Sequence, residues 1–346
     1  MHPFVNVLME KKPIVWEEIK KYLTPQEVPP KYEDIKNFHI KMVKDYPERQ
    51  GKYVRPTLVL LMCEAMGGDP NKAIKTAAAM QTSEDWILIH DDFEDDSEER
   101  RGRPALHKIY GRELAINAGD DLHIRMWKIL RDNEKVLGPQ KTFEIMDEFY
   151  KMLLRATIGQ TVEIKWTKEN KIDFTDEDYF FIVDGKTVYY TIAGPMRLGA
   201  IVAGATREQL DAIFKVGTPL GRCFQIKDDL LNLIGDEKKY GKEIGGDIIE
   251  GKRTLMLGHL LRSAKDDDRK RIIEILNKPR EEKTQEDVFE VIELMKKYGS
   301  IEYGQKIAER LAKEAMENFE KLDFLKENKA KEQLRMAIDF MLNRDK

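Results

Sequence analysis

Cysteine is scarce in this chain: Cys63 and Cys223 are the only two among 346 residues, and they lie far apart in the sequence. This excludes a disulfide framework and the clustered spacing of a zinc or redox motif, and it is typical of a reducing cytoplasm. Apolar runs are also short. None reaches the roughly 18 residues of a membrane span, and MHPFVNVLMEKKP at the start has too short an apolar stretch for a signal peptide. We therefore expect a cytoplasmic protein with no membrane span.

An excess of basic residues is missing as well. Lys and Arg total 59 against 63 Asp and Glu, a net charge of −4, so the basic footprint of a nucleic-acid-binding protein is absent. No G-x-S-x-G or H-E-x-x-H motif supports a serine hydrolase or a zinc protease. GDIIEGKR (246–253) resembles a nucleotide-binding P-loop, but Arg253 stands where Ser or Thr should bind Mg²⁺, and polar residues precede it instead of an apolar strand. We expect neither nucleic acid nor a P-loop nucleotide.

Helical periodicity is abundant. Apolar residues recur at helical spacing in many segments. One example is the series Leu58, Leu61, Met62, Ala65 and Met66. Alternating, strand-like runs are scarce. Single prolines such as Pro56, Pro139 and Pro219 predict helix starts or ends. The sequence predicts an all-α protein of one domain (1–346) around a central cavity, with an irregular or short-helical lead-in over residues 1–35.

The segment HDDFEDDSEERRGRP (90–104) is rich in acidic residues and directly follows an apolar run. On a helix, Asp91 and Asp95 share a face one turn apart, where two like charges repel by roughly 0.2–0.5 kcal/mol. A bound cation would offset this repulsion, and carboxylate oxygens on one face suit Mg²⁺. The alternative is a charged, solvated helix end.

A second acidic pair strengthens the metal hypothesis. GRCFQIKDDLLN (221–232) contains Asp228 and Asp229, with Asn232 at the third acidic position. Two such motifs on separate helices could face each other across a cavity and hold several Mg²⁺ ions against a diphosphate. Lys and Arg side chains near these motifs are suitable phosphate ligands, although each alone is more typical of a protein surface.

Together these stretches resemble the trans-isoprenyl diphosphate synthase family, which makes farnesyl, geranylgeranyl and longer prenyl diphosphates. The resemblance is carried by GKYVRP (51–56), LIHDDFEDDSEERRGRPALH (88–107), GQ (159–160), DGKT (184–187), FQIKDDLLN (224–232), YGK (240–242) and GGDIIEGKRTL (245–255). It implies the isoprenoid synthase fold, with helices around a deep cavity, usually as a homodimer. It also implies Mg²⁺-dependent condensation of isopentenyl diphosphate with an allylic prenyl diphosphate, by ionisation, condensation and elimination.

The resemblance implies a role for each motif residue. The Mg²⁺ ligands would be Asp91, Asp95 and Asp228, supported by Asp92 and Asp229. The allylic diphosphate would be bound by Arg100, Lys186 and Lys242. Isopentenyl diphosphate would be bound by Lys52, Arg55 and Arg101. Thr187 and Gln225 would lie beside the ionising carbon, and Lys252 would add positive charge near the metals.

Three positions depart from the family's pattern. Glu84 stands where the family usually has a His or Gln that contacts isopentenyl diphosphate, and a carboxylate there repels the substrate unless it is protonated or paired. Asn232 replaces the common third Asp of the second motif, and Glu163 replaces a usual Asp. Glu84 and Asn232 motivate the alternative of a non-catalytic or modified subunit of a heteromeric prenyl synthase, whereas the change at Glu163 is mild.

Product length in the family depends on bulky residues four or five positions before the first Asp, which form the floor of the pocket. The candidates here are Ser83, Trp86 and Ile87, and Trp86 is the bulkiest. This pattern resembles enzymes that stop at 15 or 20 carbons, and we favour 20. A helical wheel turns Trp86 about 140° away from Asp91, so core packing is the alternative for this side chain.

Two other functions remain as alternatives. A terpene cyclase uses the same ionisation chemistry but usually lacks the GKYVRP-type isopentenyl site. A plain acidic helical interaction module would show no Mg²⁺-dependent ligand binding.

Overall fold

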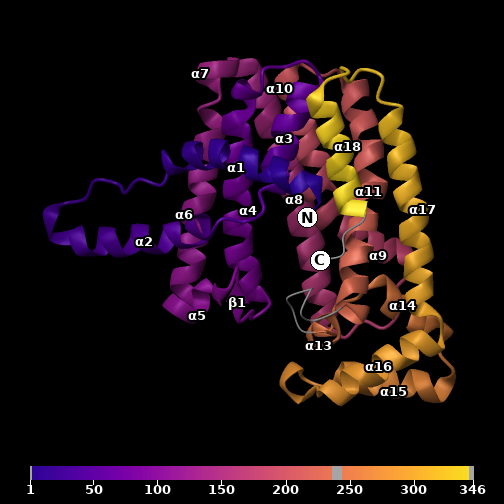
Figure 1. Ribbon diagram of the computed structural model, residues 1–346. Coiled ribbons are helices and arrows are strands. Elements are labelled where there is room, and N and C mark those ends of the chain that lie inside the picture. The colour runs from indigo at the N-terminus through magenta and orange to yellow at the C-terminus, as the bar shows by residue number, and fades with distance from the viewer. Residues whose placement is uncertain (1, 236–243, 343–346) are drawn as a thin grey trace. The chain divides into compact units, whose positions relative to one another are not determined.

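The computed structural model describes residues 2–235 and 244–342, and nearly all of its regular elements are helices (Figure 1). The prediction of an all-α chain is confirmed, with one addition. Strands β1 (Glu99–Arg100) and β2 (Arg103–Pro104) pair antiparallel just after the first acidic motif. The chain forms two compact units, the first from Met1–Phe149, Pro195–Leu210 and Phe324–Met336, and the second from Tyr150–Gly194, Asp211–Asp323 and Ala337–Lys346. The single-domain organisation of residues 1–346 stays a prediction.

The first unit is built around helix α4, which packs against α1, α3 and α6; Figure 1 shows α4 and α6 side by side. Ala77, Ala78 and Ala79 of α4 are fully buried, and such small side chains let neighbouring helices approach closely. The helices that lie in this unit are α1 (Pro3–Lys20), α2 (Glu33–Arg49), α3 (Val54–Ala65), α4 (Ile74–Glu94), α5 (Leu106–Tyr110), α6 (Arg112–Arg131) and α7 (Glu134–Leu137). Helices α8 (Pro139–Lys168), α10 (Gly194–Ala203), α11 (Arg207–Ile234) and α18 (Lys329–Leu342) each contribute residues to both units.

An irregular or short-helical lead-in is expected from the sequence, but residues 3–20 form one long helix, α1, of 18 residues. Phe4, Leu8, Val15 and Ile19 are buried at helical spacing, so an amphipathic face holds the segment against the unit. The imidazole of His2 accepts a hydrogen bond from the Phe4 N–H, which caps the helix. Only the stretch that follows, residues 21–29, has no regular structure.

The second unit contains the remaining helices. They are α9 (Asp176–Val183), α13 (Gly246–Glu250), α14 (Leu255–Ser263), α15 (Asp266–Asn277), α16 (Gln285–Lys297) and α17 (Ser300–Glu320). Helix α17 packs against both α14 and α16, while α9 packs against α14. In neither unit does the described part of the chain contain a helix that is both long and apolar enough to cross a membrane.

Two irregularities shape the helices of the second unit. Pro219 lies inside α11, so the prediction that it marks a helix end is wrong. Proline has no N–H to donate to the Lys215 carbonyl, four residues earlier. The side-chain amide of Asn318 donates to that carbonyl at 3.0 Å instead, so the acceptor is satisfied and the helix can continue. The segment η3 (Asp184–Ala193) is a π-helix that follows α9 directly. Gly221 of α11 lets η3 approach, because an added Cβ would lie 2.7 Å from the Val188 Cα.

Candidate functional site

The first acidic motif divides its carboxylates between two environments. Asp91 and Asp95 lie one turn apart at the end of α4 and are half-buried. The Asp95 N–H donates to the Asp91 carbonyl at 2.9 Å, so the helical geometry continues through the motif. Asp92, between them, is fully buried. The sequence therefore presents two accessible carboxylates and turns the third into the unit.

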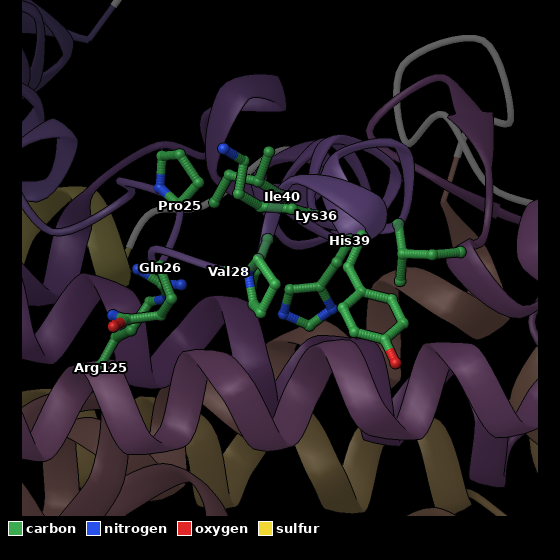
Figure 2. A pocket seen from close by; sticks show the side chains of 10 residues that line it. Pro25, Gln26, Val28, Lys36, His39, Ile40 and Arg125 are labelled. Atoms are coloured by element: carbon green, nitrogen blue, oxygen red, sulfur yellow. The ribbon is translucent and has the colours of Figure 1, made fainter.

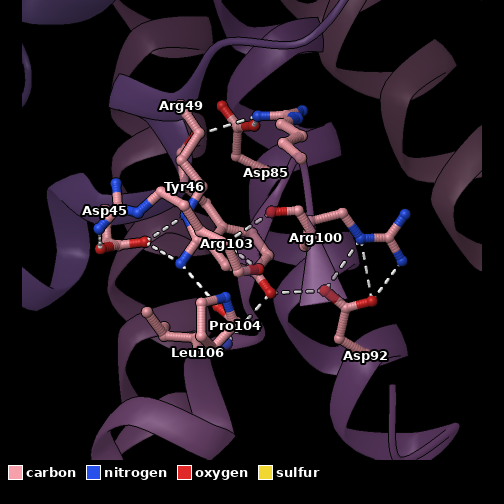
Figure 3. Close-up of polar contacts among 10 residues, drawn as sticks. Asp45, Tyr46, Arg49, Asp85, Asp92, Arg100, Arg103, Pro104 and Leu106 are labelled. Atoms are coloured by element: carbon pink, nitrogen blue, oxygen red, sulfur yellow. Dashed lines mark hydrogen bonds and ion pairs between the residues drawn. The ribbon is translucent and has the colours of Figure 1, made fainter. Parts of the chain in front are cut away.

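Asp92 anchors Arg100, as Figure 3 shows. The Arg100 Nε lies 3.0 Å from each Asp92 oxygen, and its Nη2 also donates to Oδ1. The Tyr46 hydroxyl donates to Asp92 Oδ2 at 2.5 Å and accepts the Leu106 N–H at 3.2 Å. Burial disfavours the charge of Arg100, but Asp92 outweighs this effect and raises the Arg100 pKa. Burial and the charge of Asp92 also raise the pKa of Tyr46.

The hairpin that carries Arg100 is braced from α2. Arg49 Nη1 donates to the Arg100 carbonyl at 2.8 Å, and its Nη2 donates to the Pro104 carbonyl at 2.9 Å (Figure 3). Asp45 holds both Arg49 and Arg103. The strands β1 and β2 are thus fixed to the body of the first unit, and they fix the backbone of the two predicted phosphate ligands at positions 100 and 101.

Glu84 lies between the two arginines predicted to bind isopentenyl diphosphate. Its carboxylate oxygens are 3.1 Å from Arg55 Nη1 and 3.5 Å from Arg101 Nη2. A paired carboxylate repels an incoming diphosphate less than an isolated one, because its charge is already compensated. The structure therefore brings together Glu84, Arg55 and Arg101, while Lys52 lies exposed in the preceding loop.

Asp85 is a member of this cluster that the sequence reasoning missed. Its Oδ1 accepts from Arg101 Nη1 at 3.0 Å, and the same Nη1 lies 3.0 Å from the Tyr46 carbonyl. Asp85 is almost completely buried. Burial raises its pKa to about 7; Arg101 opposes this shift and Glu84 adds to it. Gly51 gives room for the Arg101 side chain, since an added Cβ would lie 2.8 Å from its Nη2.

Trp86 packs toward α6. Its ring centroid lies 4.8 Å from that of His123 and 5.6 Å from that of His90. His123 is itself fixed, because its Nε2 accepts the indole N–H of Trp127 at 2.9 Å. Ser83 is fully buried and its hydroxyl donates to the Met80 carbonyl, whereas Ile87 is half-buried. The roles of these residues in product length stay predictions.

The second acidic motif repeats the division seen in the first. Asp228 is half-buried, while Asp229 is buried and accepts three hydrogen bonds. The donors are the Tyr179 hydroxyl and Lys252 Nζ, both at 2.8 Å, and Gln225 Nε2 at 2.9 Å. Burial opposes the charge of Lys252, but the nearby carboxylates, Asp229 foremost, raise its pKa well above the ordinary value.

The π-helical segment η3 places two predicted residues in this network. The Thr187 hydroxyl donates to Gln225 Oε1 at 2.7 Å, so these two residues are adjacent, while their place beside the ionising carbon stays a prediction. Lys186 forms an ion pair with Glu163. Burial alone would raise the pKa of Glu163, but Lys186 and Lys252 lower it overall, so the carboxylate stays charged. Lys242 lies outside the described residues.

Asn232 has a structural role that explains its departure from the acidic pattern. Its side-chain Oδ1 accepts the Asp247 N–H at 3.0 Å, and its carbonyl accepts the Gly245 N–H at 2.7 Å. These bonds hold the start of α13. An amide supplies the required acceptor without adding charge beside Asp247, whose pKa is raised by burial and by Asp229 and Asp228, with Lys252 opposing.

The residues that hold the motifs from outside could not be identified from the sequence motifs alone. Tyr46 and Tyr179 carry no local signal, because each contacts its aspartate from 46 and 50 positions away. A signal for Asp85 existed: Gln81 to Asp85 form a polar run within a helix that is otherwise largely apolar. Such a run on a buried helix indicates a site, since buried polar groups need partners.

Carboxylate oxygens are the donors that Mg²⁺ prefers, and Asp91 and Asp95 supply them on one side of α4. Within the described ranges, no three His, Cys, Asp or Glu side chains converge into a ready-made metal site. Mg²⁺ commonly takes one or two carboxylate ligands from a protein and completes its shell with water and substrate phosphate.

A separate cavity of about 310 Å³ lies between residues 25–40 and α6 (Figure 2). Its walls are largely apolar, and its basic residues are engaged: His39 pairs with Asp121 at 2.9 Å, and Arg125 donates to the Thr24 carbonyl at 2.9 Å. None of the predicted site residues lines this cavity. It is therefore no part of the candidate site.

Comparisons with known proteins agree with these motifs. Residues 37–295 match the family model of polyprenyl synthetase. The chain is 37% identical over 299 residues to the short chain isoprenyl diphosphate synthase of Methanothermobacter thermautotrophicus, covering 85% of this chain and 87% of that protein. It is 31% identical to the geranylgeranyl diphosphate synthase of Saccharolobus solfataricus, covering 86% and 87% of the two chains.

A solved structure extends the similarity to nearly the whole chain. The geranylgeranyl pyrophosphate synthetase of Pyrococcus horikoshii superposes with a TM-score of 0.86 and 33% sequence identity, covering 99% of this chain and 98% of that one. Together with the match over residues 37–295, this shows that the chain belongs to the polyprenyl synthetase family, the trans-isoprenyl diphosphate synthases, and is a trans-prenyltransferase.

Proposed function

We propose that this enzyme condenses isopentenyl diphosphate with an allylic prenyl diphosphate, in the presence of Mg²⁺, to give a trans-prenyl diphosphate of 15 or 20 carbons, with 20 favoured. The relatives named short chain isoprenyl and geranylgeranyl diphosphate synthase support a product in this range. The match of a third relative, named geranylfarnesyl diphosphate synthase, at 30% identity leaves room for a longer product.

The division of carboxylates in both acidic motifs carries the proposal. In each motif a half-buried aspartate, Asp91 in the first and Asp228 in the second, is followed by one that is buried against a cation. Asp92 holds Arg100, and Asp229 holds Lys252. A solvated charge run would not contain a fully buried carboxylate beside each half-buried one, because burying a charge is costly unless it is paired.

Asp91, Asp95 and Asp228 would hold the Mg²⁺ ions. When bound, Mg²⁺ would stabilise the negative charge that develops on the leaving diphosphate. Arg100, Lys186 and Lys242 would bind the allylic diphosphate, and Lys252 would add positive charge. These cationic side chains act on the same developing charge, which is usually the largest catalytic effect.

The remaining steps need little proton chemistry from the protein. The allylic C–O bond breaks, and Thr187 and Gln225 would face the resulting carbocation with oxygen atoms. The double bond of isopentenyl diphosphate, held by Lys52, Arg55 and Arg101, attacks the cation. The proton is then lost to the departing diphosphate, so no protein base is required. An apolar pocket must exclude water, which would otherwise quench the cation.

The two departures that motivated a non-catalytic subunit have structural explanations that favour activity. Glu84 is paired with Arg55 and Arg101, which reduces its repulsion of a diphosphate. Asn232 supports the start of α13 through its side-chain oxygen. The isopentenyl site that these arginines would form also argues against a terpene cyclase.

An incubation with isopentenyl diphosphate, Mg²⁺ and each of three allylic primers tests the proposal. The primers are dimethylallyl, geranyl and farnesyl diphosphate, and the products are separated by chain length. We expect a product of 20 carbons, formed with Mg²⁺ and lost when EDTA removes it. The absence of any product that requires isopentenyl diphosphate would contradict the proposal.

We also propose a homodimer. Tyr150, Leu154 and Ile158 recur every four residues along α8, and their side chains are 59%, 46% and 42% exposed. Three large apolar residues on one helix face are costly to leave in water, and a second copy of the chain would cover them.

A further inference from the structure

Lys12 occupies an unusual position on α1. It falls on the helix face that carries Leu8, Val15 and Ile19, all of which are buried. Lys12 is half-buried there, and its Nζ lies 5.5 Å from the ring centroid of Tyr53. In the part of the chain that the structure describes, no carboxylate pairs with Lys12, whereas its neighbour Lys11 pairs with Glu10. A charge on a buried face without a carboxylate partner points to an anionic ligand.

Lys12 shares its surroundings with the predicted isopentenyl site. Burial lowers its pKa, and the positive charge of Arg101 lowers it further, so the two cations lie close together. Tyr53, whose ring lies under Lys12, belongs to the GKYVRP motif and sits between Lys52 and the start of α3. Its hydroxyl is buried and finds no hydrogen-bond partner among the described residues. Burial raises the pKa of Tyr53, and the negative charges of Asp85 and Glu84 add to this shift while Arg101 opposes it.

The charges of the cluster explain why another cation is needed. Glu84 pairs with Arg55 and Arg101, and Asp85 pairs with Arg101 again. Glu84 offsets one of the two guanidinium charges, and Asp85 offsets the other to the extent that it is ionised, so the arginines alone attract a diphosphate less strongly than two uncompensated cations would. A diphosphate monoester carries two to three negative charges near neutral pH. Lys12 brings a positive charge that no carboxylate among the described residues offsets.

We infer that Lys12 is a further residue that binds the diphosphate of isopentenyl diphosphate. Its charge would compensate for the arginine charge that Glu84 neutralises. This inference rests on the proposed function of the GKYVRP site. It gives α1 a direct role in substrate binding, because the lysine must reach the site from that helix. It also identifies Glu84 and Lys12 as a functional pair, although the structure shows no direct contact between them.

The Lys12→Gln variant tests the inference. We expect the KM for isopentenyl diphosphate to rise about tenfold, which corresponds to about 1.4 kcal/mol. The KM for the allylic primer and kcat should change less than twofold. Lys12→Arg keeps the charge and should keep the KM within about threefold, which guards against a packing effect. Lys20→Gln is the matched control, because it removes one charge from the same helix at an exposed Lys20–Glu17 pair, and it should leave both KM values unchanged.

A double mutant tests the link with Glu84. Glu84→Gln alone should lower the KM for isopentenyl diphosphate, because it removes the negative charge near the substrate. In the Glu84→Gln background, Lys12→Gln should raise that KM by less than threefold, since there is less charge to offset. A tenfold increase in both backgrounds would contradict the pairing of Lys12 with Glu84.

The outcomes separate this inference from the proposed function. If the wild-type protein forms no product from isopentenyl diphosphate, the proposed function itself is wrong. If the wild type is active and Lys12→Gln leaves the KM for isopentenyl diphosphate unchanged, only the role of Lys12 is wrong. An equal rise in both KM values, or a fall in thermal stability with no KM change, would show that Lys12 acts on the fold of α1.

Discussion

Asp91 and Asp92 are adjacent in sequence, yet their surroundings give them different roles. Asp91 is half-buried on the side of α4 that it shares with Asp95. Asp92 is fully buried and accepts hydrogen bonds from Arg100 and Tyr46. A partly exposed carboxylate can reach a metal ion, whereas a fully buried one that holds Arg100 and Tyr46 cannot. Mutation should therefore separate a ligand from an anchor at neighbouring positions.

We expect Asp91→Ala to lower turnover by several orders of magnitude while leaving stability nearly unchanged. Asp92→Ala should instead destabilise the protein by about 1–3 kcal/mol, because it leaves the Tyr46 hydroxyl and the Arg100 guanidinium without their acceptor. Turnover at saturating Mg²⁺ and urea unfolding, measured for both variants, check the two expectations. Near-normal turnover in Asp91→Ala would remove this residue from the metal site.

Asp85 should make stability depend on pH. Its pKa is raised from 3.8 to about 7, first by burial, with Glu84 adding to the shift and Arg101 opposing it. Between pH 4 and about 7 the folded protein keeps a proton that the unfolded chain has lost. Stability from this group is therefore present at low pH and is lost as the pH rises through that window.

Asp85→Asn should remove this dependence. The amide oxygen still accepts from Arg101, but it does not titrate. We expect the variant to gain on the order of 1–3 kcal/mol relative to the wild type between pH 5 and pH 8. Urea unfolding of both proteins at these two pH values measures the difference. Parallel pH profiles would show that Asp85 does not change its protonation in this range.

At the scale of single elements, helix α4 shows what sequence can predict. Its periodicity and acidic motif predicted a helix that ends in two carboxylates on one face, and the structure has Asp91 and Asp95 one turn apart. The sequence could not predict that Tyr46 of α2 reaches Asp92, because that contact depends on how two distant helices pack. The motif residues could be named, but the buried groups that hold them could not.

The same contrast between motif residues, which the sequence identifies, and packing, which it does not, holds for other elements. The DGKT motif indicated Lys186 and Thr187, but the hydrogen bond between Thr187 and Gln225 is known only from the structure. The π-helical geometry of η3 was not predicted from the sequence, and neither was its close approach to Gly221 of α11. Likewise, Pro219 suggested a helix end, and only the distant Asn318 shows why α11 continues.

The packing of α4 on α6 bears on product length. Trp86 lies against His123, which accepts a hydrogen bond from Trp127. If Trp86 forms the floor of the product pocket, Trp86→Ala should lengthen the product by at least one five-carbon unit, with a similar rate per condensation. Chain-length analysis measures the product, and thermal unfolding serves as the control. An unchanged product with lower thermal stability would assign Trp86 to the core and make Ile87 the next residue to truncate.

At the scale of the whole molecule, helix α8 exposes a row of apolar side chains, which a dimer would cover. Tyr150, Leu154 and Ile158 are large, apolar and 42–59% exposed. Scattered apolar side chains are common on protein surfaces, but a row with helical spacing is typical of an interface. A stable dimer commonly buries about 1,200–2,000 Å² in total, which a helix face and its neighbours can provide.

We expect the wild-type protein to be a dimer at micromolar concentration, and Leu154→Glu to shift it to a monomer, because the dimer would bury the new charges without partners. Phe289→Glu is the matched control, since Phe289 of α16 is also 57% exposed and apolar. Light scattering coupled to size-exclusion chromatography gives the mass of each species. A Leu154→Glu variant that stays dimeric would show that α8 lies outside the interface. If both variants become monomeric, the effect comes from added negative charge, and the assignment of α8 to the interface fails.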